Sequence, residues 1–228
     1  MLNRSMNAYN SIPRYSLRED FANSIIHGVG FILSIIGMCV LIAFASIYGN
    51  AWHVISCSIY GSTLVFLYTA STLYHSIQLA KAKRVLRVLD HSTIFLLIAG
   101  TYTPFTLVNL RGPWGWSLFG VIWALAVIGI LFQTTMLRKG AVVSVAFYVT
   151  MGWVVVVAIR PMLSLVDTGG LVLLLLGGVA YTTGVVFYLW RQMPYNHAIW
   201  HVFVLAGSAL HFFSILLYVI PLSPPLTN

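Results

Sequence analysis

Seven long apolar stretches, separated by short polar or Gly- and Pro-containing segments, restrict the fold of this sequence more than any other feature. They cover residues 21–48, 53–79, 89–108, 116–135, 141–159, 170–190 and 197–220. A helix needs about 20 apolar residues to cross a hydrocarbon core of roughly 30 Å. Strands of membrane barrels are shorter and alternate in polarity, whereas these stretches are continuously apolar. We therefore predict an all-α membrane protein with seven transmembrane helices.

Charged residues are too scarce to cover a water-exposed surface. The 228 residues include 12 Lys and Arg and 4 Asp and Glu, which is 7% charge, against about 25% in an ordinary soluble domain. The outer surface must then face lipid. The prediction is a single transmembrane domain over residues 21–220, with a short N-terminal segment at 1–20 and a short tail at 221–228.

The distribution of the basic residues predicts which side each end occupies. The net charge is +8, but the basic residues form short groups between apolar stretches, and no contiguous stripe suited to a nucleic acid is present. Ten of the 12 lie before the first stretch or after the second, fourth and sixth, and the other two are Arg111 and Arg160. Because cytoplasmic loops carry the excess of Lys and Arg, we expect a cytoplasmic N-terminus and an outer C-terminus.

Three histidines are predicted to meet at the cytoplasmic ends of their helices. His197 and His201 are four residues apart at the start of the seventh stretch, so they share one helix face and can present two imidazoles to one metal ion. His75 lies at the same predicted depth near the end of the second stretch. Three nitrogens with a fourth position open are typical of a catalytic zinc site. The alternative is that these side chains only hydrogen-bond between helices.

Two further polar residues lie at the same predicted depth. Asp90 begins the third stretch, and Ser71 is four residues before His75 on the same helix face. Asp90 is interpreted as a fourth metal ligand or as a group that reaches the metal through a water and accepts its proton. Its alternative role is an ion pair with Arg87 or Lys83. Ser71 is interpreted as a hydrogen-bond donor to an oxyanion or to that water.

A polar line also follows the first helix. Glu19, Asn23 and His27 step by four residues and either line the same cavity or serve structural roles, with Glu19 as a favourable charge at the helix N-terminus. At 1.5 Å per residue, His27 and Glu19 are about 12 Å apart, too far to bind one ion together. His211 and His53 are set aside as ligands because of their predicted depth.

Four segments resemble the bacterial hemolysin III family. They are EDFANSIIHG at 19–28, STLYH at 71–75, DHSTIFLLIAGTYTPF at 90–105 and PYNHAIWH at 194–201. That family belongs with the progestin and adiponectin receptors, and more distantly with the alkaline ceramidases. The resemblance implies seven helices and an intracellular Zn²⁺ bound by three histidines, with an aspartate near the metal.

The resemblance also assigns these roles to positions of this chain. By motif, the histidine ligands correspond to His75, His197 and His201, the aspartate to Asp90, and the Ser-x-x-x-His serine to Ser71. It implies a bacterial multi-pass protein of the cell inner (plasma) membrane. The chain lacks the long cytoplasmic extension of the animal receptors, so hormone-receptor behaviour is not implied.

Three functions are compatible with these residues. The leading hypothesis is a zinc-dependent hydrolase that acts on a lipid amide or ester from the cytoplasmic leaflet, with membrane lipid as its partner and no nucleic acid. The alternative is a non-enzymatic sensor or receptor for lipid state in which the zinc is structural. The third, a pore-former, is what the family name suggests, but no ring of charge typical of a selectivity filter is present. The sequence does not determine the substrate or the oligomeric state.

Overall fold

The computed structural model describes residues 15–135 and 141–221, which fold into a bundle of seven membrane-length spans without a strand in the described part. The first two spans are α2 (Leu17–Tyr48) and α3 (Ala51–Ser76), and the last two are α8 (Thr168–Leu189) and α9 (Asn196–Tyr218). The middle three are α4 (Ala80–Pro104) with the π-helix η1 (Phe105–Asn109), α5 (Pro113–Thr135), and α6 (Ala141–Gly152) with the 3₁₀ helix η3 (Trp153–Ala158) and α7 (Ile159–Leu165). The predicted seven-helix membrane class is confirmed.

Several helices extend beyond the apolar stretches that predicted them. The first begins at Leu17 rather than at 21, and the third begins at Ala80 rather than at 89, so Lys83 and Arg87 are helical. An apolar stretch marks only the part of a helix that crosses the hydrocarbon core. The helix itself extends further, because its backbone hydrogen bonds continue into the polar residues beyond that core. Ser16 fixes the first start through a capping box with Glu19.

Pro104 marks an irregular region in the third span. It is the last residue of α4, and the π-helical turn η1 continues the same span. A proline lacks the amide hydrogen that a regular helix needs, so the hydrogen bonding changes there without ending the span.

The helix α2 is polar inside and apolar outside. Asp20, Asn23 and His27 are buried, whereas Phe21 and Ile25 are 68% and 51% exposed. In lipid, apolar side chains face outward, and small or polar side chains form the contacts between helices. The buried side of α2 therefore faces α3 and α9, which places its polar groups inside the bundle.

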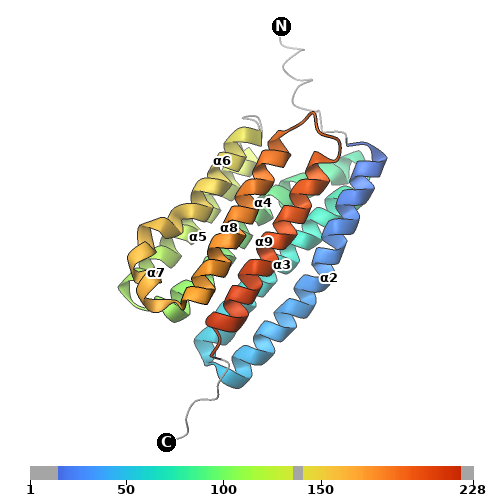
Figure 1. Cartoon of the computed structure of the whole chain (residues 1–228). Coiled ribbons are helices and arrows are strands. Elements are labelled where there is room, and N and C mark those ends of the chain that lie inside the picture. Colours follow the sequence, from blue (N-terminus) through green and yellow to red (C-terminus); the bar gives the residue numbers. More distant parts are fainter. Residues whose placement is uncertain (1–14, 136–140, 222–228) are drawn as a thin grey trace, which may run out of the picture.

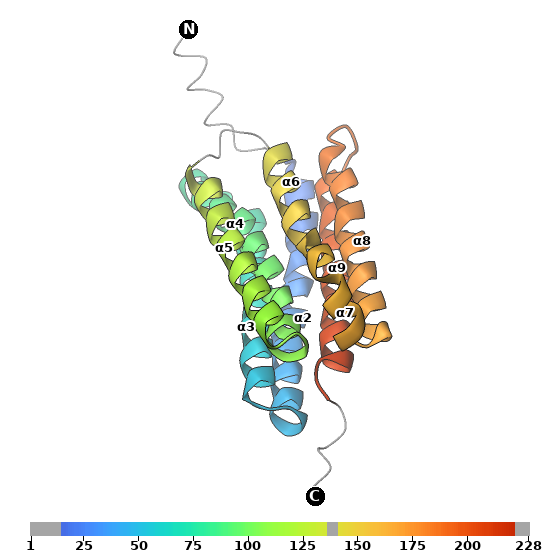
Figure 2. The ribbon, with the colours of Figure 1, turned by 90° about the vertical axis from the view of Figure 1, so that its left-hand side faces the viewer.

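One end of the bundle gathers the predicted site residues. There, α2, α4 and α9 begin, while α3 and α8 end, at the top of Figure 1. In Figure 2, α6 lies between the α4–α5 pair and the α8–α9 pair, and α7, which continues the same span, overlaps α9 in this view. Some predictions fall outside the described residues: most of the N-terminal segment 1–20, the tail 222–228, and the basic residues Arg4, Arg14, Arg138 and Lys139. The assignment of each end to a side of the membrane stays a prediction.

Candidate metal centre

The three predicted histidines come together. His75 lies near the end of α3, and His197 and His201 lie on the first two turns of α9. They are 1%, 5% and 2% exposed, and one nitrogen from each lies within 4.8 Å of the others. The Nε2 atoms of His75 and His201 are 3.2 Å apart. Two nitrogens bound to one tetrahedral zinc at about 2.0–2.1 Å would be separated by about 3.3 Å, so this pair already has the spacing of ligands.

The hydrogen bonding of His197 fits a metal ion. Both of its ring nitrogens are buried without a hydrogen-bond partner in the described structure, as is Nδ1 of His201. A buried polar atom without a partner costs about 1–3 kcal/mol. A metal ion uses the lone pair of one nitrogen and removes much of that cost, so these three residues can hold a metal ion.

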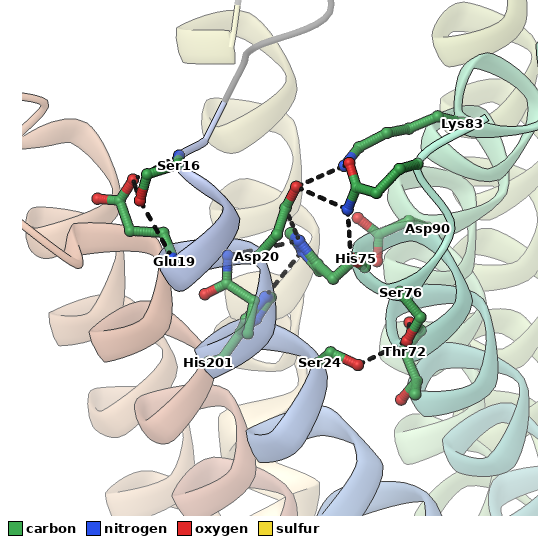
Figure 3. A network of polar contacts seen from close by, with 12 residues as sticks. Ser16, Glu19, Asp20, Ser24, Thr72, His75, Ser76, Lys83, Asp90 and His201 are labelled. Atoms are coloured by element: carbon green, nitrogen blue, oxygen red, sulfur yellow. Dashed lines mark hydrogen bonds and ion pairs between the residues drawn. The ribbon is translucent and has the colours of Figure 1, made fainter. Parts of the chain in front are cut away.

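Asp20 is a site residue that sequence reasoning missed. The His75 Nδ1–H group donates to Asp20 Oδ1 at 2.9 Å, which leaves the Nε2 lone pair free for a metal. Asp20 Oδ2 accepts hydrogen bonds from Lys83 Nζ at 2.6 Å and from Gln78 Nε2 at 3.2 Å (Figure 3). A carboxylate behind a metal-binding histidine fixes its orientation and increases its basicity. The 3- and 4-residue spacing of Asp20, Asn23 and His27 was the signal that could have revealed this face.

Glu19 has a different role from its neighbour. Its carboxylate accepts hydrogen bonds from Ser16 and from the backbone N–H of Tyr195, the latter at 3.2 Å. Tyr195 has a left-handed backbone, with a φ of 57°, just before α9. Glu19 thus caps α2, as the structural interpretation predicted, and also connects it to the turn that positions His197.

Asp90 lies in the same region of the bundle, but not in the ion pair that was considered for it. It is 7% exposed and lines a cavity together with His197 and His201. Lys83 pairs with Asp20 instead, and the described contact of Asp90 is with His91 Nδ1 at 3.5 Å. The carboxylate is therefore available to a ligand in the cavity. The Ser71 hydroxyl is buried and has no hydrogen-bond partner in the described structure.

His27 lies closer to the candidate metal centre than its position in the sequence indicated. Its ring centroid lies 3.5 Å from that of His201, and its ring packs edge-on against Tyr68 at 5.1 Å. It lines the cavity, as one of the two interpretations predicted. His211 also lines the cavity, but its Nε2–H donates to the carbonyl of Leu174.

Tyr15 covers the histidines at the end of the bundle. Its ring stacks on that of His197, with centroids 4.8 Å apart, and lies 5.8 Å from that of His75. Burial raises the pKa of the Tyr15 hydroxyl above its ordinary value, so this residue is neutral at physiological pH. An aromatic ring in this position limits access of water to the site from that end.

The cavity beside the centre has a volume of about 510 Å³. Its polar end carries His27, Asp90, His197 and His201, and most of its remaining wall is apolar. The wall includes Val156, Leu163 and Leu175, which are 54%, 65% and 55% exposed. Since these residues belong to the fifth and sixth spans, the cavity approaches the lipid-facing surface between them. The volume and the apolar wall suit a small molecule or an acyl chain.

The fold and the site together define a class: an integral membrane protein of seven helices with a buried three-histidine centre beside an apolar cavity. The family model described as "Haemolysin-III related" matches residues 15–212. The chain belongs to the hemolysin III family.

Curated relatives match nearly the whole chain. "Hemolysin-3" of Bacillus cereus is 48% identical over 205 residues, which are 90% of this chain and 94% of the relative. "Hemolysin-3 homolog" of Bacillus subtilis (strain 168) is 44% identical over 206 residues, covering 90% and 97% of the two chains. "Monocyte to macrophage differentiation factor" of Homo sapiens is 30% identical over 207 residues, covering 88% and 84%. No solved structure matches the chain.

Proposed function

We propose that this protein is a zinc-dependent hydrolase that cleaves a lipid amide or ester from the cytoplasmic leaflet of the cell (inner) membrane. The observation that carries the proposal is a cluster of three buried histidines, two of which, His197 and His201, line the polar end of an apolar cavity together with Asp90. An apolar cavity with a few convergent polar groups is typical of a ligand site. The acyl chain would occupy the apolar part, with its amide or ester bond beside the histidines.

The ligand set supports zinc. His75, His197 and His201 supply three imidazole nitrogens, as in known catalytic zinc sites. When bound, zinc would polarise the carbonyl of the substrate and promote ionisation of the attacking water. Asp20 would keep the proton of His75 on Nδ1, so that Nε2 faces the metal.

Two other residues act on the attacking water and on the carbonyl group of the substrate. A carboxylate oxygen of Asp90 accepts the proton of the attacking water and delivers it to the leaving group. The hydroxyl of Ser71, which has no partner in the described structure, donates a hydrogen bond to the carbonyl oxygen as negative charge develops there. Tyr15 and the surrounding helices limit the water that can enter.

The proposal can be tested by metal analysis combined with turnover. Purified wild type is expected to contain about one zinc per chain and to hydrolyse at least one member of a panel of ceramides, acyl amides and phospholipids. His197→Ala should lose the metal, because one of three ligands is removed. Asp90→Asn should keep the metal and lose at least about a hundredfold in turnover, the lower range for general acid–base groups. Absence of zinc from the wild type would refute the proposal.

A non-enzymatic sensor with structural zinc is the second candidate. All three histidines are nearly inaccessible, and Tyr15 stacks over one of them, an arrangement that also suits a closed structural site. Stoichiometric zinc without turnover on the whole panel, and full biological function of Asp90→Asn, would favour this candidate.

A further inference from the structure

His27 is a buried histidine that neither the metal centre nor the helix packing accounts for. It is 3% exposed, and neither ring nitrogen has a hydrogen-bond partner in the described structure. Four other buried or half-buried histidines have at least one nitrogen hydrogen-bonded to an oxygen of the chain: His53, His75, His91 and His211. Since orphaned buried nitrogens are costly and rare, the native partner of His27 must be something other than the chain itself.

His27 is not one of the three candidate metal ligands. The nitrogens that lie within 4.8 Å of one another belong to His75, His197 and His201, and His27 is outside this group. Its ring nevertheless lies next to that of His201 and lines the cavity. His27 therefore borders the space that a ligand beside the metal would occupy.

The ring of His27 is held against a fixed wall. Tyr68 packs edge-on against it, and the Tyr68 hydroxyl donates to Ser208 Oγ at 2.9 Å. Behind Tyr68, a Cβ atom on Gly30 would lie 2.5 Å from the tyrosine ring, so the ring has no room to move toward α2. A polar group whose orientation is set before binding loses little entropy when the ligand arrives.

We propose that His27 is a ligand-binding residue that hydrogen-bonds the head group of the lipid whose chain fills the cavity. The assignment of a lipid to the cavity rests on the proposed function. A neutral imidazole donates through one nitrogen and accepts through the other, which matches an amide or hydroxyl head group. The described residues that line the cavity include no Lys or Arg, the residues that ordinarily bind phosphate. The head group that this site takes is neutral, an amide or an alcohol, and not a phosphate.

The experiment uses photoaffinity labelling of the full chain in phosphatidylcholine vesicles. Two probes carry a diazirine in the same position of the chain: stearamide, which has the amide head group, and octadecane, which lacks it. Wild type is compared with His27→Phe, His27→Gln and the control His211→Phe, which alters a half-buried histidine of the same cavity whose Nε2–H already donates to the carbonyl of Leu174. Metal content is measured for each variant.

The wild type is expected to label with stearamide about tenfold more efficiently than with octadecane, as one hydrogen bond in a buried site allows. His27→Phe should lose this preference and keep its metal, His27→Gln should retain part of it, and His211→Phe should retain all of it. Unlabelled octadecyl phosphate should compete at least tenfold less well than unlabelled stearamide. If His27→Phe fails to fold, His27→Leu is measured for the same loss.

Several results would overturn the proposal. Retention of the preference in His27→Phe would show that water alone satisfies this residue, and loss of metal would make His27 a ligand of the metal. Equal labelling of the wild type by both probes would exclude head-group recognition, and equal competition by octadecyl phosphate would exclude a neutral head group. Failure of the proposed function is read separately: a wild type that shows the preference but hydrolyses no lipid refutes the hydrolase and leaves the role of His27 intact.

Discussion

At the residue scale, the two ring nitrogens of His75 face different partners. This arrangement explains how His75 can bind a carboxylate and a metal ion at the same time. Nδ1 donates to Asp20, and Nε2 lies 3.2 Å from Nε2 of His201. Asp20 in turn accepts from Lys83 and Gln78, so its charge is compensated although it is 3% exposed. A carboxylate that accepts the hydrogen bond of the His75 Nδ1–H group keeps the ring in the tautomer whose Nε2 can bind a metal.

Replacing Asp20 by Asn should weaken metal binding without removing a ligand. The amide cannot match the charge of the carboxylate, so we expect the metal affinity of Asp20→Asn to fall by about 10–100-fold. Competition with a chelator of known affinity measures this change. Asp167→Asn is the matched control, because Asp167 caps the start of α8, at the other end of the bundle, by accepting from the Gly169 N–H. Equal affinities for Asp20→Asn and the wild type would show that Asp20 serves only the ion pair with Lys83.

At the scale of the elements, the packing of α2 against α3 brings its polar face to the histidines. Gly30 lies one turn beyond His27 on this face and contacts the ring of Tyr68. Small residues let membrane helices approach closely, and this approach places His27 beside Tyr68. In the same way, Glu19 joins the start of α2 to the turn before α9. The site thus depends on how three helices meet, and each contributes residues over one or two turns.

A methyl group at position 30 tests this contact. In Gly30→Ala the new Cβ would lie 2.5 Å from the Tyr68 ring, so the helices must separate or the ring must move. We expect a loss of about 1–3 kcal/mol in stability, as for overpacking in a core, measured by unfolding in detergent. Gly120→Ala is the control, since no atom lies within 4 Å of its added Cβ, and it should be neutral or stabilising. An equal stability of Gly30→Ala and the wild type would contradict tight packing here.

At the scale of the whole molecule, the seven spans place the start of α2 and the end of α9 at opposite ends of the bundle (Figure 1). The metal centre lies at the end where α2 and α9 begin. Of the eight described basic residues, six belong to segments at this end: Arg18, Lys81, Lys83, Arg84, Arg87 and Arg191. The positive-inside rule then predicts that this end, and the candidate site with it, faces the cytoplasm.

Reporter fusions test that orientation. A phosphatase that is active only outside the cytoplasm, fused after residue 228, is expected to be active. The same reporter fused after Lys139, in the predicted cytoplasmic loop between the fourth and fifth spans, should be inactive. The reverse pattern would place the candidate site on the outer side and would refute a substrate drawn from the cytoplasmic leaflet.

The class of fold follows from the sequence alone, because crossing lipid imposes a length and an apolar composition that can be counted. The sequence also predicted that His197 and His201 share a face, since spacing within one helix is a local property. It predicted that His75 lies at the same depth, since short connections leave little freedom along the membrane normal. The structure brings these three residues together.

The rotation of each helix about its axis was decided only by the tertiary structure. That rotation directs Asp20 rather than Glu19 toward His75, pairs Lys83 with Asp20 rather than with Asp90, and brings His27 against His201. In a membrane protein the Leu, Val and Phe side chains that face lipid resemble those that face the core, so the sequence carries little information on rotation. Close packing of small residues such as Gly30 against aromatic rings sets it instead.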